Sequence, residues 1–131
     1  MNVEISKAEL ALMFKALGDP TRLGIFQLLR CCAGDECGVE VHEEGMVRPA
    51  GSLSVGEVCC RVTGEDRITS TISHHLKELR LAGLIRMEKR GRWTYCSIHA
   101  EALVVIGQFV AGPERGSCRD LAVEASTACC S

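Results

Sequence analysis

Cysteine is the residue type whose number and spacing in this sequence point most directly to chemistry. The chain has nine cysteines, and six of them form the adjacent pairs Cys31-Cys32, Cys59-Cys60 and Cys129-Cys130. An odd number of cysteines behind a polar N-terminus with no secretion signal argues against a disulfide scaffold. We therefore expect free thiols in a cytoplasmic protein. Clustered thiols favour soft metal ions, although a single cysteine also serves as a small buried core residue.

A second chemical pattern is the distribution of charge. The 131-residue chain has a formal net charge of −2, which alone does not suggest a nucleic-acid binder. Residues 66–92, however, carry seven basic and three acidic side chains, whereas residues 33–65 carry two basic and seven acidic ones. A basic segment in an otherwise acidic chain is typical of a surface that contacts phosphates.

Apolar spacing predicts the elements that position these groups. Helical periodicity predicts helices over 5–17, 20–31, 54–62, 68–82 and 99–111, the fourth of which begins at either Ile68 or Thr69. Asp19-Pro20 is a helix start, and Gly83 ends the fourth helix. Two alternating runs, 84–89 and 93–98, flank a glycine turn and predict a β-hairpin. The acidic stretch 33–53 is predicted to be an inserted loop in a domain over 1–112, followed by a cysteine-containing tail over 113–131.

The order helix, tight turn, helix and hairpin predicts a mainly α fold with a small β-hairpin, the winged helix-turn-helix. At about 100° per residue, Ile68, Ile72, Leu76 and Leu79 form one apolar stripe of the helix over 68–82. Hydroxyl, imidazole and lysine side chains occupy the other side, and the hairpin tip is basic, both of which suit DNA grooves and phosphates. The predicted DNA contacts are Thr69, Ser70, Thr71, Ser73, His74, His75, Lys77, Lys89, Arg90 and Arg92. His75 lies nearest the apolar stripe, so packing and DNA contact both stay open for it.

Several motifs resemble those of one known family. Residues 14–23, Phe-Lys-Ala-Leu-Gly-Asp-Pro-Thr-Arg-Leu, resemble a signature of the ArsR/SmtB family of metal-responsive repressors. Residues 71–79, 82–85 and 90–95 resemble that family's recognition helix and wing. The resemblance covers residues 8–111 apart from the insertion. It implies a homodimer formed through the first and last helices, an inverted-repeat operator in double-stranded DNA, and release of that operator when an inducer binds.

The resemblance does not identify the inducer. Where the family often has Cys-Val-Cys-Asp-Leu, this chain has Ser-Val-Gly-Glu-Val at residues 54–58, so that arsenite motif is not matched. The last helix has His99 and Glu101 but lacks the second histidine of the family's zinc site. The usual metal-binding residues of the family therefore cannot be transferred to this chain.

Cys59 and Cys60 are the thiols nearest to the predicted recognition helix. Neighbouring side chains on a helix diverge by about 100°, so these two thiols need partners from elsewhere in the chain. We expect the inducer site to consist of Cys59, Cys60, Cys129 and Cys130. Cys118 and the group Cys31, Cys32 and Cys37 are further candidates. Thiolates suit As(III) or Sb(III), with mercury, cadmium or lead as alternatives.

The residues also allow functions other than that of a metal-responsive repressor. A repressor of the same fold that senses thiol oxidation would need no metal. A soft-metal carrier or interaction protein would account for the cysteines but not for the recognition helix. An enzyme is not expected, because the chain has no Cys-x-x-Cys, Gly-x-Ser-x-Gly or His-Glu-x-x-His motif. No apolar run reaches the roughly 18 residues that a membrane span needs, so no membrane partner is expected.

Overall fold

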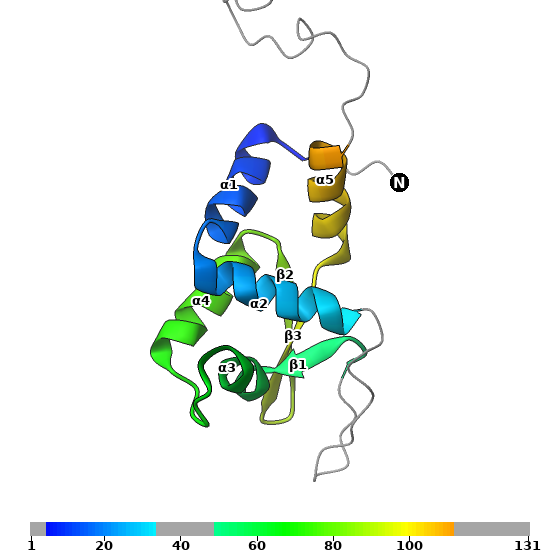
Figure 1. The fold of residues 1–131 in the computed structure, drawn as a ribbon. Coiled ribbons are helices and arrows are strands. Elements are labelled where there is room, and N and C mark those ends of the chain that lie inside the picture. Colours follow the sequence, from blue (N-terminus) through cyan, green and yellow to red (C-terminus); the bar gives the residue numbers. More distant parts are fainter. Residues whose placement is uncertain (1–4, 34–48, 112–131) are drawn as a thin grey trace, which may run out of the picture.

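The structure is a computed structural model that describes residues 5–33 and 49–111 (Figure 1). The elements in chain order are α1 (Lys7–Leu17), α2 (Pro20–Cys31), β1 (Ser52–Ser54), α3 (Val55–Thr63), α4 (Ser70–Leu81), β2 (Ile85–Arg90), β3 (Trp93–Ile98) and α5 (Ala100–Ala111). In Figure 1, α1 and α5 lie at the upper end of the molecule, and α3 and the β2–β3 turn lie at the lower end. Most of the predicted loop and all of the predicted tail lie outside the described residues.

Side-chain caps mark the starts of α1 to α4. Asp19 caps α2, with Pro20 in the first helical position, as the sequence predicts. Ser6 and Ser54 each form a capping box with a glutamate three residues later. Thr69 caps α4, so that helix begins at Ser70 rather than at residue 68. Caps of this kind satisfy backbone N–H groups that have no partner within the helix.

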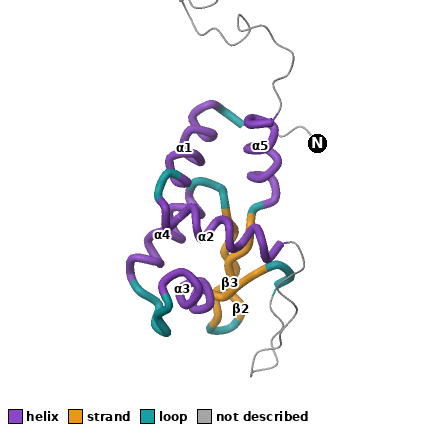
Figure 2. The backbone as a smooth tube through the Cα atoms, viewed as in Figure 1, coloured by secondary structure: helices purple, strands orange, loops and turns teal. Residues whose placement is uncertain are grey.

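The strands form one antiparallel sheet in the order β1-β3-β2, shown in orange in Figure 2. The β2–β3 hairpin is confirmed, and its register pairs Arg90 with Trp93 across the turn. Strand β1 was not predicted. Its three residues are too few to show alternation, and its pairing with β3 is a long-range contact. The small hairpin is therefore part of a three-stranded sheet.

The core lies between α2, α3, α4 and the sheet, and α1 and α5 also contribute buried side chains to it. Ile72, Leu76 and Leu79 of α4 are at most 1% exposed, which confirms three positions of the predicted apolar stripe. The prediction for Ile68 is wrong, because its side chain is 55% exposed. Ile68 precedes the cap of α4, so its side chain does not follow the helical periodicity that would turn it inward.

Gly64 ends α3 in the left-handed conformation, with a φ of +79°. Its backbone N–H donates to the carbonyl of Cys60 over 2.8 Å. We expect Gly64→Ala to destabilise the fold by about 1 kcal/mol, because a side chain disfavours this conformation. Urea unfolding would measure the change. Gly24 in α2 is the matched control, because an added Cβ meets nothing within 4 Å at either position. Gly24→Ala should stabilise the helix, and a loss of similar size in both variants would contradict the argument.

Candidate nucleic-acid interface

The turn between α3 and α4 is held by hydrogen bonds from side chains of α3. The Cys59 thiol donates to the carbonyl of Arg67 over 3.1 Å. The Thr63 hydroxyl donates to the carbonyl of Cys59 over 2.7 Å and accepts from the N–H of Glu65 over 3.1 Å. These bonds connect α3 directly to the residues that precede α4. The orientation of α4 therefore depends on α3, as in a helix-turn-helix.

Helix α4 presents a polar face to solvent. Its exposed residues among the predicted DNA contacts are Ser70, Thr71, Ser73, His74 and Lys77. Thr69 is half-buried, and its hydroxyl accepts the N–H of Ile72, so its side chain serves as the cap. Small hydroxyl side chains near the start of a helix allow the backbone to approach base edges closely. The face opposite the core thus has the size and chemistry of a major-groove surface.

The β2–β3 turn carries the other predicted contacts. Lys89, Arg90 and Arg92 are all exposed around Gly91, whose φ is +63°. The Arg90 Nε donates to the Glu88 carboxylate over 3.3 Å, which offsets part of its charge. The Arg92 guanidinium lies 5.9 Å from the centre of the Trp93 ring. This turn is a basic wing tip, with Lys89 and Arg92 outside that ion pair.

The recognition face and the wing border the same hollow. A cavity of about 380 Å³ is lined by Ser73 and Leu76 of α4, Arg92 and Trp93 of the hairpin, and the start of α3. In Figure 1 these elements meet at the lower end of the molecule, away from α1 and α5. Ser73 and Arg92 therefore face one site, as contacts with a groove and its flanking phosphate backbone require.

His75 is oriented by residues outside α4. Its side chain is 14% exposed, and its Nδ1 lies 3.3 Å from a terminal nitrogen of Arg22. The Asp19 carboxylate lies 3.9 Å from the same ring nitrogen. Arg22 was not among the predicted contacts, although the ArsR-like signature includes it. The neighbouring His74 is an exposed residue with a weak, 4.0 Å contact to Glu78.

The described cysteines occupy different environments. Cys59 is fully buried, and Cys60 and Cys31 are exposed; all three are free thiols. Cys32 is buried and disulfide-bonded, so the expectation of a free thiol is wrong for this residue. Burial raises the pKa of the Cys96 thiol to about 12, so this thiol stays protonated at neutral pH. Cys129, Cys130, Cys118 and Cys37 lie outside the described residues.

The predicted thiol site is therefore incomplete within the described residues. Cys59 and Cys60 point in different directions, as adjacent helical side chains should. Among residues 5–33 and 49–111, no cluster of three or more His, Cys, Asp or Glu side chains could hold a metal ion. A site containing Cys59 and Cys60 stays a prediction that needs thiols from the rest of the chain.

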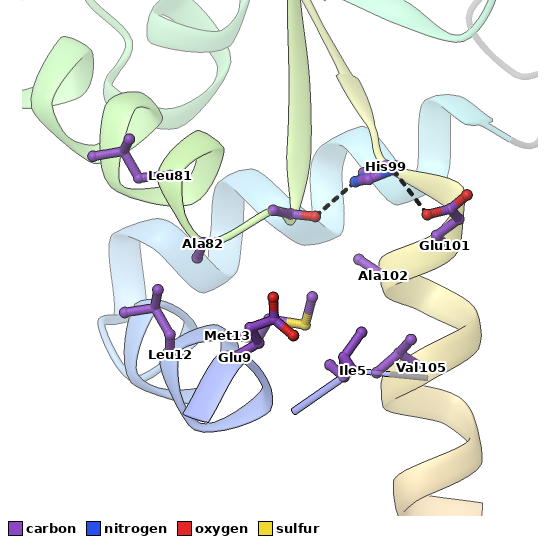
Figure 3. Close-up of a pocket in the computed structure, with 11 residues that line it drawn as sticks. Ile5, Glu9, Leu12, Met13, Leu81, Ala82, His99, Glu101, Ala102 and Val105 are labelled. Atoms are coloured by element: carbon purple, nitrogen blue, oxygen red, sulfur yellow. Dashed lines mark hydrogen bonds and ion pairs between the residues drawn. The ribbon is translucent and has the colours of Figure 1, made fainter. Parts of the chain in front are cut away.

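A second hollow, of about 210 Å³, lies between α1, the end of α4 and α5 (Figure 3). His99 borders it, and its Nδ1–H donates to the carbonyl of Gly83 over 2.9 Å. Its Nε2 lies 3.6 Å from the Glu101 carboxylate. His99 therefore joins the start of α5 to the turn that follows the recognition helix.

Comparison with known proteins agrees with this geometry. Residues 17–88 match the family model described as a helix-turn-helix domain. An uncharacterised helix-turn-helix transcriptional regulator of Methanocaldococcus jannaschii is 35% identical over 84 residues, which span 63% of this chain and 70% of the relative. This chain belongs to the helix-turn-helix transcriptional regulators. Both comparisons thus point to a regulator of transcription.

Solved structures identify the type of fold. An ArsR family transcriptional regulator matches with a TM-score of 0.56 at 24% identity, over 79% of this chain and 89% of the other. A homodimeric winged helix-turn-helix domain from Mycobacterium bovis matches with a TM-score of 0.50 at 20% identity, over 89% of this chain and 100% of the other. HlyU of Vibrio cholerae also gives 0.50, at 21% identity, over 84% and 100% of the two chains. The regulator thus has the ArsR-type fold, which confirms the resemblance seen in its sequence.

None of the helices in the described part of the regulator has the length and apolar character that a membrane crossing requires.

Proposed function

We propose that this regulator is a homodimeric repressor that binds an inverted-repeat operator and releases it when a thiophilic ion binds. The proposal that the regulator binds DNA rests on the hollow that α4 and the wing share, which Ser73 and Arg92 both line. Exposed hydroxyl, imidazole and basic side chains surround it, and these are the groups that contact base edges and phosphates.

Support for a homodimer comes from apolar side chains on α1 and α5. The large apolar side chains exposed there, by 36% to 68%, are Leu12, Phe14, Val104, Phe109 and Val110. Phe14 and Phe109 lie side by side, with ring centres 5.4 Å apart, so these two side chains connect the exposed apolar surfaces of α1 and α5. A patch of this kind on a small domain marks an interface. A two-fold dimer would cover it and would match an inverted repeat.

Support for an ion response comes from the position of Cys59 and Cys60. The Cys59 thiol holds the carbonyl of Arg67, two residues before the cap of α4. A thiolate that binds a metal ion has lost its proton and cannot donate this hydrogen bond. Capture of Cys59 would therefore release the turn that orients α4. Cys60 is exposed beside it, where an arriving ion first meets a thiol. We propose Cys129 and Cys130 as the completing ligands.

Fluorescence anisotropy with the DNA upstream of the regulator's own gene tests this proposal. Under reducing conditions we expect tight, salt-dependent binding that arsenite or antimonite reverses. Mercury, cadmium, lead and zinc would be titrated in parallel. Binding that no ion disturbs but peroxide reverses would favour the redox-sensing repressor. No binding to DNA would favour the carrier.

Cysteine variants locate the response. We expect Cys60→Ser to bind DNA normally and to lose its response to arsenite, because the exposed thiol is gone. Cys31→Ser is the comparison variant, since Cys31 is also exposed but lies at the end of α2, away from the α3–α4 turn. A response lost in Cys31→Ser but kept in Cys60→Ser would place the ion at the other candidate group instead. The same anisotropy titration applies to both variants. A normal arsenite response of Cys60→Ser would show that this site assignment is wrong.

A further inference from the structure

Arg22 joins three parts of the fold. Its backbone N–H donates to the Asp19 carboxylate over 3.0 Å at the start of α2. Its Nε–H donates to the carbonyl of Ala16, in the last turn of α1, over 2.7 Å. Its Nη1 lies 3.3 Å from Nδ1 of His75, on α4. Arg22 therefore connects the junction of α1 and α2 to the recognition helix.

These contacts determine where His75 carries its proton. A guanidinium group only donates hydrogen bonds, so the contact with Arg22 requires Nδ1 to accept. A neutral imidazole that accepts at Nδ1 carries its proton on Nε2. The Asp19 carboxylate, 3.9 Å from Nδ1, only accepts and would favour a proton on Nδ1 instead. Arg22 and Asp19 thus favour opposite states of one nitrogen, and only Arg22 is within hydrogen-bonding distance.

Asp19 stays available as the competing group. The backbone N–H of Arg22 holds the pKa of the Asp19 carboxyl below its ordinary value. Asp19 is therefore a carboxylate at neutral pH. If the Arg22 guanidinium were removed, this carboxylate would be the polar group nearest to Nδ1, and the proton would move to that nitrogen.

The other ring nitrogen of His75 lies at the edge of the DNA-facing surface. No described residue forms a hydrogen bond with Nε2 of His75. The preceding residue, His74, is exposed on the polar face of α4, and the His75 side chain keeps 14% of its surface exposed beside it. A proton on Nε2 is a donor that a phosphate or base acceptor could use.

We propose that Arg22 is a positioning residue for DNA recognition, which holds His75 in the Nε2–H tautomer so that Nε2–H donates to the bound DNA. This inference rests on the proposed function, since it assigns a donor to the repressor's DNA surface. The two histidines then have different roles. His74 is an exposed side chain of the polar face, whereas the tautomer of His75 is determined by Arg22 on α2.

The first test uses the free protein. Long-range ¹H–¹⁵N correlation spectra report which imidazole nitrogen carries the proton. We expect Nε2–H for His75 in the wild type and a shift toward Nδ1–H in Arg22→Met. Arg22→Lys should retain much of the wild-type signal, because its ammonium can still donate to Nδ1. An unchanged tautomer in Arg22→Met would overturn the inference.

The second test is an epistasis measurement on operator DNA. Loss of one charge-assisted hydrogen bond should weaken binding about tenfold in Arg22→Met and in His75→Ala. His75→Gln has an amide N–H near the position of Nε2 and cannot change tautomer. In that background Arg22→Met should have little further effect. The same tenfold loss in that background would show that Arg22 acts only through the fold.

Arg30→Met tests whether net charge explains the loss, and the wild type separates this inference from the proposed function. Arg30→Met removes the same group from an exposed position of α2 and should bind DNA normally. A loss in Arg30→Met equal to that in Arg22→Met would point to net charge and overturn the inference. If the wild type binds no DNA, the proposed function fails together with the DNA contact of His75. Normal wild-type binding with an unchanged tautomer overturns this inference alone.

Discussion

The Phe109→Asp variant is expected to be a folded monomer whose affinity for a two-half-site operator falls by about a hundredfold or more. Phe109 is 62% exposed on α5, so the charge is tolerated in the free protomer. In a two-fold dimer the substitution occurs twice at the interface, where each carboxylate would lose its water. The loss in affinity follows because binding of the second half-site is no longer intramolecular. Analytical ultracentrifugation and anisotropy with paired and single half-sites would measure both effects.

Gln27→Asp provides the matched control for this change. Gln27 is exposed on α2, so the variant adds the same charge outside the apolar patch of α1 and α5. It should remain a dimer and bind the operator normally. Phe109 also contacts Phe14, so a modest fall in the melting temperature of Phe109→Asp is expected and is compatible with the proposal. A variant that stays dimeric would place the dimer interface elsewhere.

The elements that could be predicted from the sequence are those with local signals. Asp19-Pro20 determines the start of α2, and two alternating runs around Gly91 determine the hairpin. Strand β1 has no such signal, because three residues show no period and their partner strand lies more than forty residues later. Ile68 was misplaced for a related reason. Periodicity alone does not show whether the helix begins at Ile68, at Thr69 or, as in the structure, at Ser70.

The recognition face was predictable, but its supporting contacts were not. A helical wheel separates Ser70, His74 and Lys77 from the core because this separation depends only on angle. The bond between the Cys59 thiol and the Arg67 carbonyl depends on the path of the α3–α4 turn. The contact between Arg22 and His75 joins residues 53 positions apart. No rule of sequence spacing predicts either contact. The ArsR-like signature over residues 14–23 includes Arg22 but does not indicate that it contacts His75.

Removal of two wing charges should change the salt dependence of binding as well as its strength. Each lost phosphate contact reduces the slope of log K against log salt by about 0.9, so Lys89→Ala with Arg92→Ala should reduce it by about 1.8. Lys89 and Arg92 are exposed at the wing tip, and Arg92 lines the hollow beside α4. The loss should be similar for specific and unrelated DNA, since phosphates carry no sequence information. Anisotropy across a salt series would measure both slopes.

Arg90→Ala makes this prediction sharper, because Arg90 already donates to the Glu88 carboxylate over 3.3 Å. Part of its charge is offset, so its removal should reduce the slope by less than Lys89→Ala does. Lys7→Ala with Arg30→Ala removes two exposed charges from α1 and α2 and should leave the slope unchanged. An equal decrease in this control would mean that net charge, rather than the wing, governs binding. An equal decrease in all three wing variants would mean that Arg90 leaves Glu88 for a phosphate when DNA binds.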